Sequence, residues 1–296
     1  MAKSKSLAPQ PLVVRTYEEL DRYVRAFIQG HLGLLILTGN PGLGKSHGLK
    51  TALGPNACVI EGNTTAFGMF LLLHAAADLP VLIDDVDSLY RDRAAVRLLK
   101  CVCQSDPVRT ISWNSDARTL VKKNIPSQFQ TTSKVAIVAN DWRRLNKDIL
   151  ALEDRGHLLH FDPNAAEVHR KVAEWFWDPD VFDFLGERLQ LIQQPSFRHY
   201  IVAAELKQAG LNWREAVLAR CLSGKLLVVA QLKASTEYAT EERRAQAFIE
   251  AGHGCRATYF NLATKLPPLA EFPRLTLRGT RPDAGKPLQD IIGLLK

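Results

Sequence analysis

Residues 34 to 46 read LLILTGNPGLGKS, and this stretch organises the rest of the chain. Four apolar residues and Thr38 lead into the pattern G-x-x-x-x-G-K-[ST], which is typical of a loop that cradles phosphates. Glycine tolerates positive φ, so the backbone can curl and turn its N–H groups inward. The predicted loop residues are Gly39, Asn40, Pro41, Gly42, Leu43, Gly44, Lys45 and Ser46.

Two side chains at the end of this loop carry the chemistry. Lys45 brings a positive charge to the β- and γ-phosphates, and the Ser46 hydroxyl can ligate Mg²⁺. A helix over residues 46 to 53 adds the positive end of its dipole to the anion site. The alternative is a glycine-rich turn that merely joins a strand to a helix. We predict that the chain binds a nucleoside triphosphate.

Length and composition set the class of protein. The 296 residues predict two or three domains, and 46% hydrophobic with 23% charged residues is typical of a globular protein. A net charge of +7 and a pI near 9.2 favour partners that carry phosphates, or an acidic surface. The five cysteines form no C-x-x-C pair and predict reduced thiols without zinc. With neither a signal peptide nor an apolar run of membrane-spanning length, we expect a soluble cytoplasmic protein without membrane contact.

A second landmark is the segment LPVLIDDVD, residues 79 to 87. Residues 81 to 83 predict a buried strand that ends at Asp84, where ligands bind in parallel α/β sheets. Asp84 is therefore a candidate Mg²⁺ ligand, directly or through water. The alternative is an acidic turn at a strand end.

Further strands are expected at residues 57–60, 108–113, 135–139 and 158–161. Asn140 ends the third of these, where a polar amide either caps a helix or orients the attacking water. Arg155 precedes the last of them, and an isolated arginine in a polar turn is usually only solvated. Helices are expected at residues 16–30, 64–77 and 94–104.

After residue 163 the strand signals stop and helical periodicity takes over, which predicts a domain boundary near Pro163. Helices are expected at residues 164–177, 179–192, 195–209 and 212–222. The predicted division begins with a loose basic arm (1–14), followed by a nucleotide-binding domain (15–163) and a helical domain (164–224). A domain of two short helices (225–266) and a Pro-rich basic tail (267–296) complete it.

Residues 240–251 and 255–266 form two amphipathic patterns around the turn Gly252-His253-Gly254. This is the pattern of a helix-turn-helix, whose second helix enters the major groove of DNA. The alternative is a helical hairpin used for packing. Residues 225–296 carry 11 Lys/Arg against 7 Asp/Glu, which favours DNA. The candidate groove-facing residues are Arg256, Thr258, Asn261 and Lys265.

With these landmarks in this order, residues 15 to 222 resemble the AAA+ ATPases. Lys45 and Ser46 match the Walker A motif, Asp84 and Asp85 match Walker B, and Asn140 resembles sensor 1. The positions of Arg155 and Arg198 resemble those of the arginine finger and of sensor 2. The resemblance implies an α/β fold with a parallel sheet, a helical lid, ATP and Mg²⁺ as cofactors, and a ring or spiral homo-oligomer. Each ATP would then lie between subunits, with Arg155 completing the neighbour's site.

One residue departs from the family pattern, because Asp85 stands where the family has the glutamate that polarises the attacking water. Aspartate is one methylene shorter, about 1.5 Å of reach. A misplacement of about 1 Å can cost on the order of 100-fold in rate. We therefore expect slow basal ATP hydrolysis, stimulated by DNA or a partner.

The AAA+ core with a C-terminal helix-turn-helix resembles the DNA-handling branches of the family, such as replication initiators, helicase loaders and transposition regulators. The first hypothesis is an ATPase that assembles on DNA and remodels or recruits a protein partner. The second is a protein-remodelling chaperone or activase whose C-terminal helices bind protein. A metabolic P-loop kinase is disfavoured, since it would need neither the series Asn140, Arg155 and Arg198 nor the helical tail.

Overall fold

In a computed structural model the chain divides into two compact units, residues 1–162 and 163–296. The structure describes residues 10–86, 88–114, 118–140, 142, 150–221, 224–235, 237–264 and 266. Lys265 and the predicted tail, 267–296, lie outside the described residues, as do residues 1–9 of the predicted arm.

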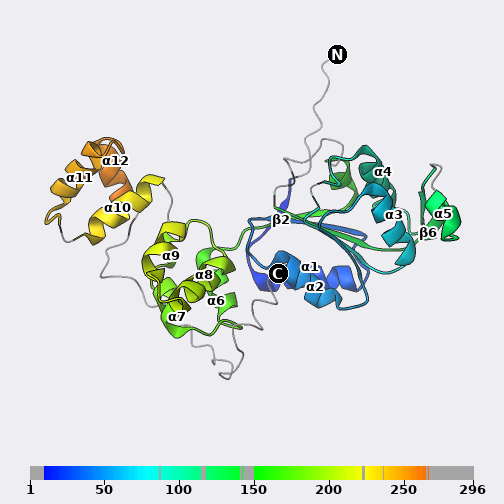
Figure 1. Cartoon of the computed structure of the whole chain (residues 1–296), viewed down its shortest axis with the longest axis horizontal. Helices are drawn as coiled ribbons and strands as arrows, with labels where there is room; N and C mark the ends of the chain where they lie inside the picture. Colours follow the sequence, from blue (N-terminus) through cyan, green and yellow to red (C-terminus); the bar gives the residue numbers. More distant parts are fainter. Residues whose placement is uncertain are drawn as a thin grey trace, which may run out of the picture. The chain divides into compact units, whose positions relative to one another are not determined.

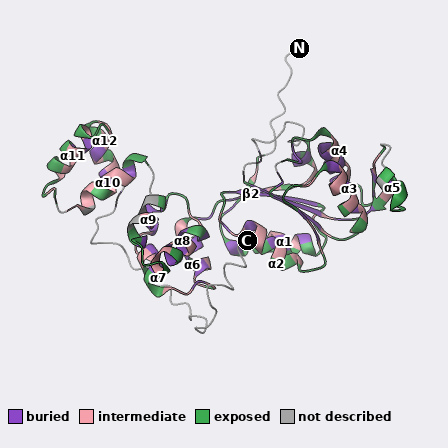
Figure 2. Ribbon diagram, in the orientation of Figure 1, coloured by how far each residue is buried: buried purple, intermediate pink, exposed green. Residues whose placement is uncertain are grey.

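The first unit is built on a six-stranded parallel sheet with the order β1-β8-β2-β7-β4-β3. Every residue of β2, β4 and β7 is buried, as expected for parallel strands that are covered on both faces (Figure 2). The strands are β1 (Leu12–Val14), β2 (Leu34–Gly39), β3 (Cys58–Glu61), β4 (Val81–Asp84), β7 (Val135–Ala139) and β8 (His157–Phe161).

Helices cover both faces of this sheet. Helices α1 (Tyr17–Ile28) and α2 (Lys45–Leu53) lie on one face, and α3 (Ala66–Ala75) and α4 (Arg93–Val102) lie on the other (Figure 1). The core between α3, α4 and the sheet includes Met69, Phe70, Leu99 and one apolar face of the strands. This three-layer arrangement is the expected α/β class.

A small antiparallel hairpin interrupts the pattern between α4 and β7. It pairs β5 (Arg109–Ser112) with β6 (Gln128–Thr131), and α5 (Arg118–Lys122) lies between them in the chain. The expected strand at 108–113 therefore belongs to this hairpin and not to the main sheet. A short 3-10 helix, η2 (Leu150–Arg155), precedes β8.

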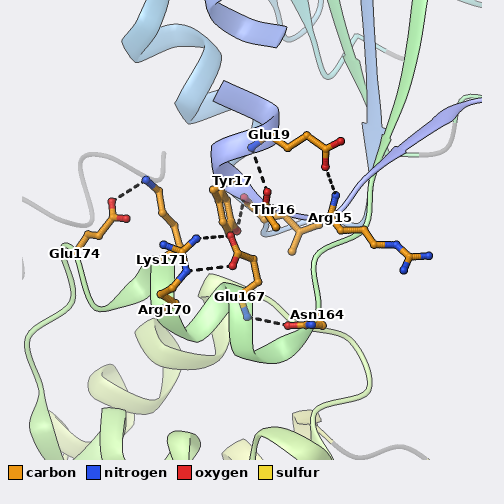
Figure 3. A network of polar contacts seen from close by, with 10 residues as sticks. Arg15, Thr16, Tyr17, Glu19, Asn164, Glu167, Arg170, Lys171 and Glu174 are labelled. Atoms are coloured by element: carbon orange, nitrogen blue, oxygen red, sulfur yellow. Dashed lines mark hydrogen bonds and ion pairs between the residues drawn. The ribbon is translucent and has the colours of Figure 1, made fainter. Parts of the chain in front are cut away.

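In the second unit, all the secondary structure among the described residues is helical. Its first group is α6 (Ala165–Val172), α7 (Pro179–Gly186), η3 (Leu189–Leu191), α8 (Phe197–Gln208) and α9 (Trp213–Cys221). Figure 3 shows the start of α6, where the Asn164 side chain accepts a hydrogen bond from the Glu167 amide at 2.9 Å. In the first unit, the Thr16 hydroxyl accepts from the Glu19 amide at 3.1 Å and starts α1 in the same way (Figure 3).

The second group is three helices, α10 (Gly224–Ala234), α11 (Glu241–Glu250) and α12 (Arg256–Ala263). They share a core that includes Val229, Phe248 and Tyr259. The ring of Phe248 packs edge-on against Tyr259, with centroids 5.7 Å apart. Helix α10 was not predicted as a separate element, although the two short helices after it were.

Three expectations about secondary structure were wrong. The arm 1–14 was expected to be loose, but Leu12–Val14 forms β1, which pairs with Leu159–Phe161 of β8. Such a pairing joins residues far apart in sequence and leaves no local pattern. The helices expected at 164–177 and 179–192 end earlier, at Val172 and Gly186. After α6, aromatic packing such as Trp175 on Phe197 replaces the last expected helical turn.

Candidate nucleotide-binding site

Three parallel strands end side by side at one edge of the sheet, because β7 lies between β2 and β4. Strand β2 ends at Gly39, β4 ends at Asp84, and β7 is followed by Asn140. The carboxyl ends of parallel strands are where α/β sheets bind ligands. Side chains from three separate segments therefore meet at this edge.

The loop between β2 and α2 needs its glycines. Gly39, Gly42 and Gly44 have φ of 145°, 80° and 74°, which L side chains rarely adopt. A Cβ on Gly39 would also stand 2.4 Å from the carbonyl oxygen of Phe161 on β8. At Gly44, the N-cap of α2, no side chain caps the helix. The first amides of α2 thus form the kind of helix start that binds a phosphate.

Lys45 is buried at the start of α2, with 5% of its surface exposed. Its Nζ donates to the carbonyl oxygens of Gly39 at 2.8 Å and of Asn40 at 2.7 Å. The same Nζ lies 3.5 Å from Oδ1 of Asn140. Lys45 therefore joins the loop to the end of β7, and the exposed Asn140 stands beside this lysine.

Ser46 and Asp84 also meet. The Ser46 hydroxyl donates to Oδ1 of Asp84 at 2.7 Å, and Asp84 is buried, with 6% of its surface exposed. A hydroxyl and a carboxylate beside a phosphate loop are the hard oxygen ligands that Mg²⁺ takes together with phosphates and water. The residues present therefore fit a Mg²⁺ ion that arrives with a nucleotide.

Asp85 follows Asp84 in an unusual backbone conformation, with φ of 53°, and it is exposed at this edge. Aspartate and asparagine adopt this left-handed region more readily than longer side chains. The aspartate in place of a glutamate thus agrees with the local backbone.

Lys50 and Glu61 were missed from the sequence. Lys50 lies four residues after Ser46 on α2, and its Nζ pairs with Oδ2 of Asp84 at 3.1 Å. It also donates a hydrogen bond to Glu61 at the end of β3. Burial lowers the pKa of Lys50, but Glu61 and Asp84 outweigh it, so the pKa lies above its ordinary value. The i, i+4 spacing from Ser46 was the available signal.

Arg155 does not join this site. It ends η2 just before β8 begins, so it lies at the opposite edge of the parallel sheet from the phosphate loop. Its Nη1 donates to the carbonyl oxygen of Lys100 at 2.7 Å, in the last turn of α4. Arg109 donates to Val102 at 3.0 Å in the same turn. Two guanidinium groups thus stabilise the negative end of α4.

The remaining predicted site residues lie in the second unit. Arg198 is exposed in the first turn of α8, where its amide donates to the Ser196 hydroxyl at 3.2 Å. On α12, Asn261 is exposed and Thr258 is partly buried, with its hydroxyl 3.3 Å from the Cys255 sulfur. Arg256 is also exposed but is paired with Glu242 of α11 through two hydrogen bonds.

No protein-family profile matches the chain. An uncharacterized 36.7 kDa protein in the nrdC-mobD intergenic region of Enterobacteria phage T4 is 23% identical over 135 residues, which cover 43% of this chain and 41% of that protein. A solved structure of a RuvB mutant from Thermotoga maritima aligns over 83% of this chain and 86% of its own, at a TM-score of 0.46 and 14% identity. The chain thus spans less than half the length of the phage relative.

The chain's own geometry defines the class. A glycine-rich loop between a buried strand and a helix, with Lys45 and the pair Ser46–Asp84 beside it, makes the first unit a P-loop α/β fold.

All five cysteines are free thiols. Among the described residues, none of the helices has both the length and the apolar character needed to cross a bilayer.

Proposed function

We propose that the chain is a Mg-ATP-dependent ATPase of the AAA+ type, which hydrolyses ATP with water to ADP and phosphate. The observation that carries this proposal is the meeting of Lys45, Asn140 and the pair Ser46–Asp84 at the ends of three adjacent strands. A P-loop used only as a turn has no need of a buried lysine beside a polar strand end. This arrangement supports Lys45 as a phosphate contact, Ser46 and Asp84 as metal ligands and Asn140 as a group that acts beside the phosphates.

Each residue then has a role. The loop amides and Lys45 bind the phosphates, while Ser46 and Asp84 hold Mg²⁺, which neutralises the charge that develops on the phosphoryl oxygens. Asn140 orients the attacking water and Asp85 polarises it. Because Asp85 is shorter than glutamate, we expect slow basal turnover. Arg198 takes the role of sensor 2 that the sequence resemblance implies.

Arg155 acts on a neighbouring copy of the chain. Since it lies at the end of its own sheet opposite the phosphate loop, it cannot complete its own site, but it could serve the site of another subunit. A guanidinium at the γ-phosphate is worth on the order of 10³ to 10⁵ in rate. We therefore propose a ring or spiral homo-oligomer with ATP at the interfaces.

The C-terminal helices direct the ATPase to DNA, where the assembly remodels or recruits a protein partner. Helices α11 and α12 join through a tight glycine turn, and α12 presents Arg256 and Asn261. A specific observation favours the second candidate function, a remodelling chaperone or activase. Arg256 is paired with Glu242, and residues 225–264 carry five Lys/Arg against four Asp/Glu, so that this surface is close to neutral.

One experiment separates the two functions. ATP hydrolysis by the full chain is measured with and without duplex DNA, alongside DNA binding over a salt series. Binding through phosphates weakens steeply as salt rises, and DNA should then stimulate turnover. Hydrolysis without any DNA binding would support the remodelling function. Lys45→Ala serves as the control, and a Lys45→Ala protein that binds Mg-ATP as tightly as the wild type would contradict both.

A further inference from the structure

Lys50 connects two carboxylates at the proposed metal site. Its Nζ is 3.1 Å from Oδ2 of Asp84 and is hydrogen-bonded to Glu61. Ser46 and Lys50 are one helical turn apart on α2, so both side chains point from the same face of the helix towards Asp84. Because Ser46 donates to the other oxygen, Oδ1, helix α2 engages both oxygens of this carboxylate.

The pairing has a clear physical reason. The Asp84 side chain is 8% exposed, and a buried carboxylate without a partner is strongly unfavourable. Lys50 supplies the positive charge that Asp84 needs while no metal is bound. An ammonium group and a divalent cation on the two oxygens of one carboxylate stand only a few ångströms apart and repel one another, so Mg²⁺ binding at Asp84 weakens the contact with Lys50.

Glu61 offers the ammonium another place. It ends β3 and lies directly beside Asp84 in the register of the parallel pair β3–β4. The Glu61 side chain is 58% exposed, so keeping an ion pair there requires little desolvation. Lys50 already reaches Glu61, so its ammonium keeps a partner when it moves away from Asp84.

We propose that Lys50 is an internal counter-cation that competes with Mg²⁺ for Asp84, and that Glu61 retains its ammonium when the metal binds. Lys50 and Glu61 are thus positioning residues that set how much Mg²⁺ the site requires. This inference rests on the proposed function, in which Asp84 and Ser46 hold Mg²⁺ together with ATP.

The test is a Mg²⁺ titration of ATP binding at fixed pH, followed with a fluorescent ATP analogue and without relying on hydrolysis. The variants are Lys50→Met, which removes the competitor, and Glu61→Gln, which removes the second acceptor. We expect Lys50→Met to lower the Mg²⁺ concentration at half-maximal binding by about fivefold to tenfold, the effect of one partly buried charge. Glu61→Gln should raise it by about twofold to threefold, since an exposed pair contributes less.

A matched control is Lys207→Met. Lys207 also lies between two carboxylates, with Nζ 2.7 Å from both Asp178 and Asp180, but it belongs to the second unit. The Lys207→Met variant should leave the Mg²⁺ concentration at half-maximal ATP binding unchanged. Because Lys50→Met leaves Asp84 with one partner fewer, its thermal unfolding is measured both in EDTA and in Mg-ATP. The variant should be less stable than the wild type in EDTA and recover most of the difference in Mg-ATP.

Opposite shifts for Lys50→Met and Glu61→Gln support the proposal. A higher Mg²⁺ midpoint for Lys50→Met would overturn it and would mean that Lys50 contacts the nucleotide instead. Unchanged midpoints in both variants would overturn it as well. Failure of the wild-type protein to bind the analogue at any Mg²⁺ concentration is a different result, because it removes the proposed function itself.

Discussion

The phosphate-loop edge of the sheet and the three helices α10–α12 were both given candidate binding residues from sequence, but their structures differ in kind. At the sheet edge, Lys45, Ser46 and Asp84 are buried or partly buried and hydrogen-bonded within one constellation. On α12, Arg256 is exposed and already paired with Glu242. The first region has a built site, whereas the second has a surface whose main positive group is engaged within the protein.

The difference teaches what a motif constrains. A phosphate loop depends on backbone shape, which a few glycines and one lysine dictate locally. A recognition surface depends on what neighbouring helices place beside each side chain. The charge excess that favoured DNA also lies mostly in residues 265–296. Of these residues, the structure describes only Leu266.

The largest expected effect concerns Arg155. Arg155→Ala should bind Mg-ATP with unchanged affinity and lose turnover by about 10³-fold or more, because the neighbour's transition state loses its guanidinium. Mixing it with Lys45→Ala should restore part of the activity at mixed interfaces. The measurements are steady-state hydrolysis and nucleotide binding.

Arg155→Ala also loses the hydrogen bond from Arg155 to the Lys100 carbonyl, which should lower the free energy of unfolding by about 0.3–1 kcal/mol. The control is Arg22→Ala, which removes an arginine from an exposed pair with Glu18 and should change neither the rate of hydrolysis nor the affinity for nucleotide. Normal hydrolysis by Arg155→Ala would contradict the shared site.

Asp85→Asn tests the proposed role of Asp85 at the phosphate-loop edge of the sheet. Asparagine also tolerates the positive φ at this position, so the backbone should stay as it is. We expect turnover to fall by about 100-fold with little change in Mg-ATP affinity. Turnover at the wild-type rate would show that Asp85 does not polarise the water.

A third prediction concerns the helical unit. His169 is buried beneath Phe182, with Nδ1 2.9 Å from the Tyr200 hydroxyl, and burial lowers the pKa of His169 to about 4. Between pH 6.5 and 4 the unfolded chain binds a proton that the folded chain excludes, so stability falls as the pH drops through this window. The loss should approach about 3 kcal/mol.

Unfolding curves between pH 7 and 4 would measure this loss, for the wild type and for His169→Gln, which can still hydrogen-bond Tyr200. The slope should be smaller in His169→Gln. His31→Gln alters an exposed histidine and should follow the wild type. Parallel curves for the wild type and His169→Gln would contradict the prediction.

The smallest expected effect tests whether α12 can bind DNA. Glu242→Gln releases Arg256 from its pair, and DNA affinity should rise about twofold to fivefold at low salt. Glu250→Gln removes the same charge from α11 without touching Arg256 and is the matched control. Equal effects of the two variants would mean that only net charge matters. No DNA binding in either would favour the protein-remodelling function.

Much of the first unit was predictable because its signals are local. The apolar runs at β2, β4 and β7 and the loop from Gly39 to Ser46 need no partner to be recognised. Strand β1 was missed because its partner β8 lies far away in the chain. Strand β5 was recognised as a strand, but nothing local showed that it pairs with β6 and not with the main sheet. The end of α6 also depends on a distant contact, the packing of Trp175 against Phe197.

The sequence by itself determined that a phosphate loop follows a buried strand, because glycine spacing and a lysine specify that backbone without any distant contact. Only the tertiary structure decided which side chains share the site. The strand order brings Asn140 to Lys45, and the register of β3 with β4 sets Glu61 beside Asp84 and Lys50. It also places Arg155 on the far edge of its sheet, because strand direction and not sequence distance fixes the edge on which a residue lies.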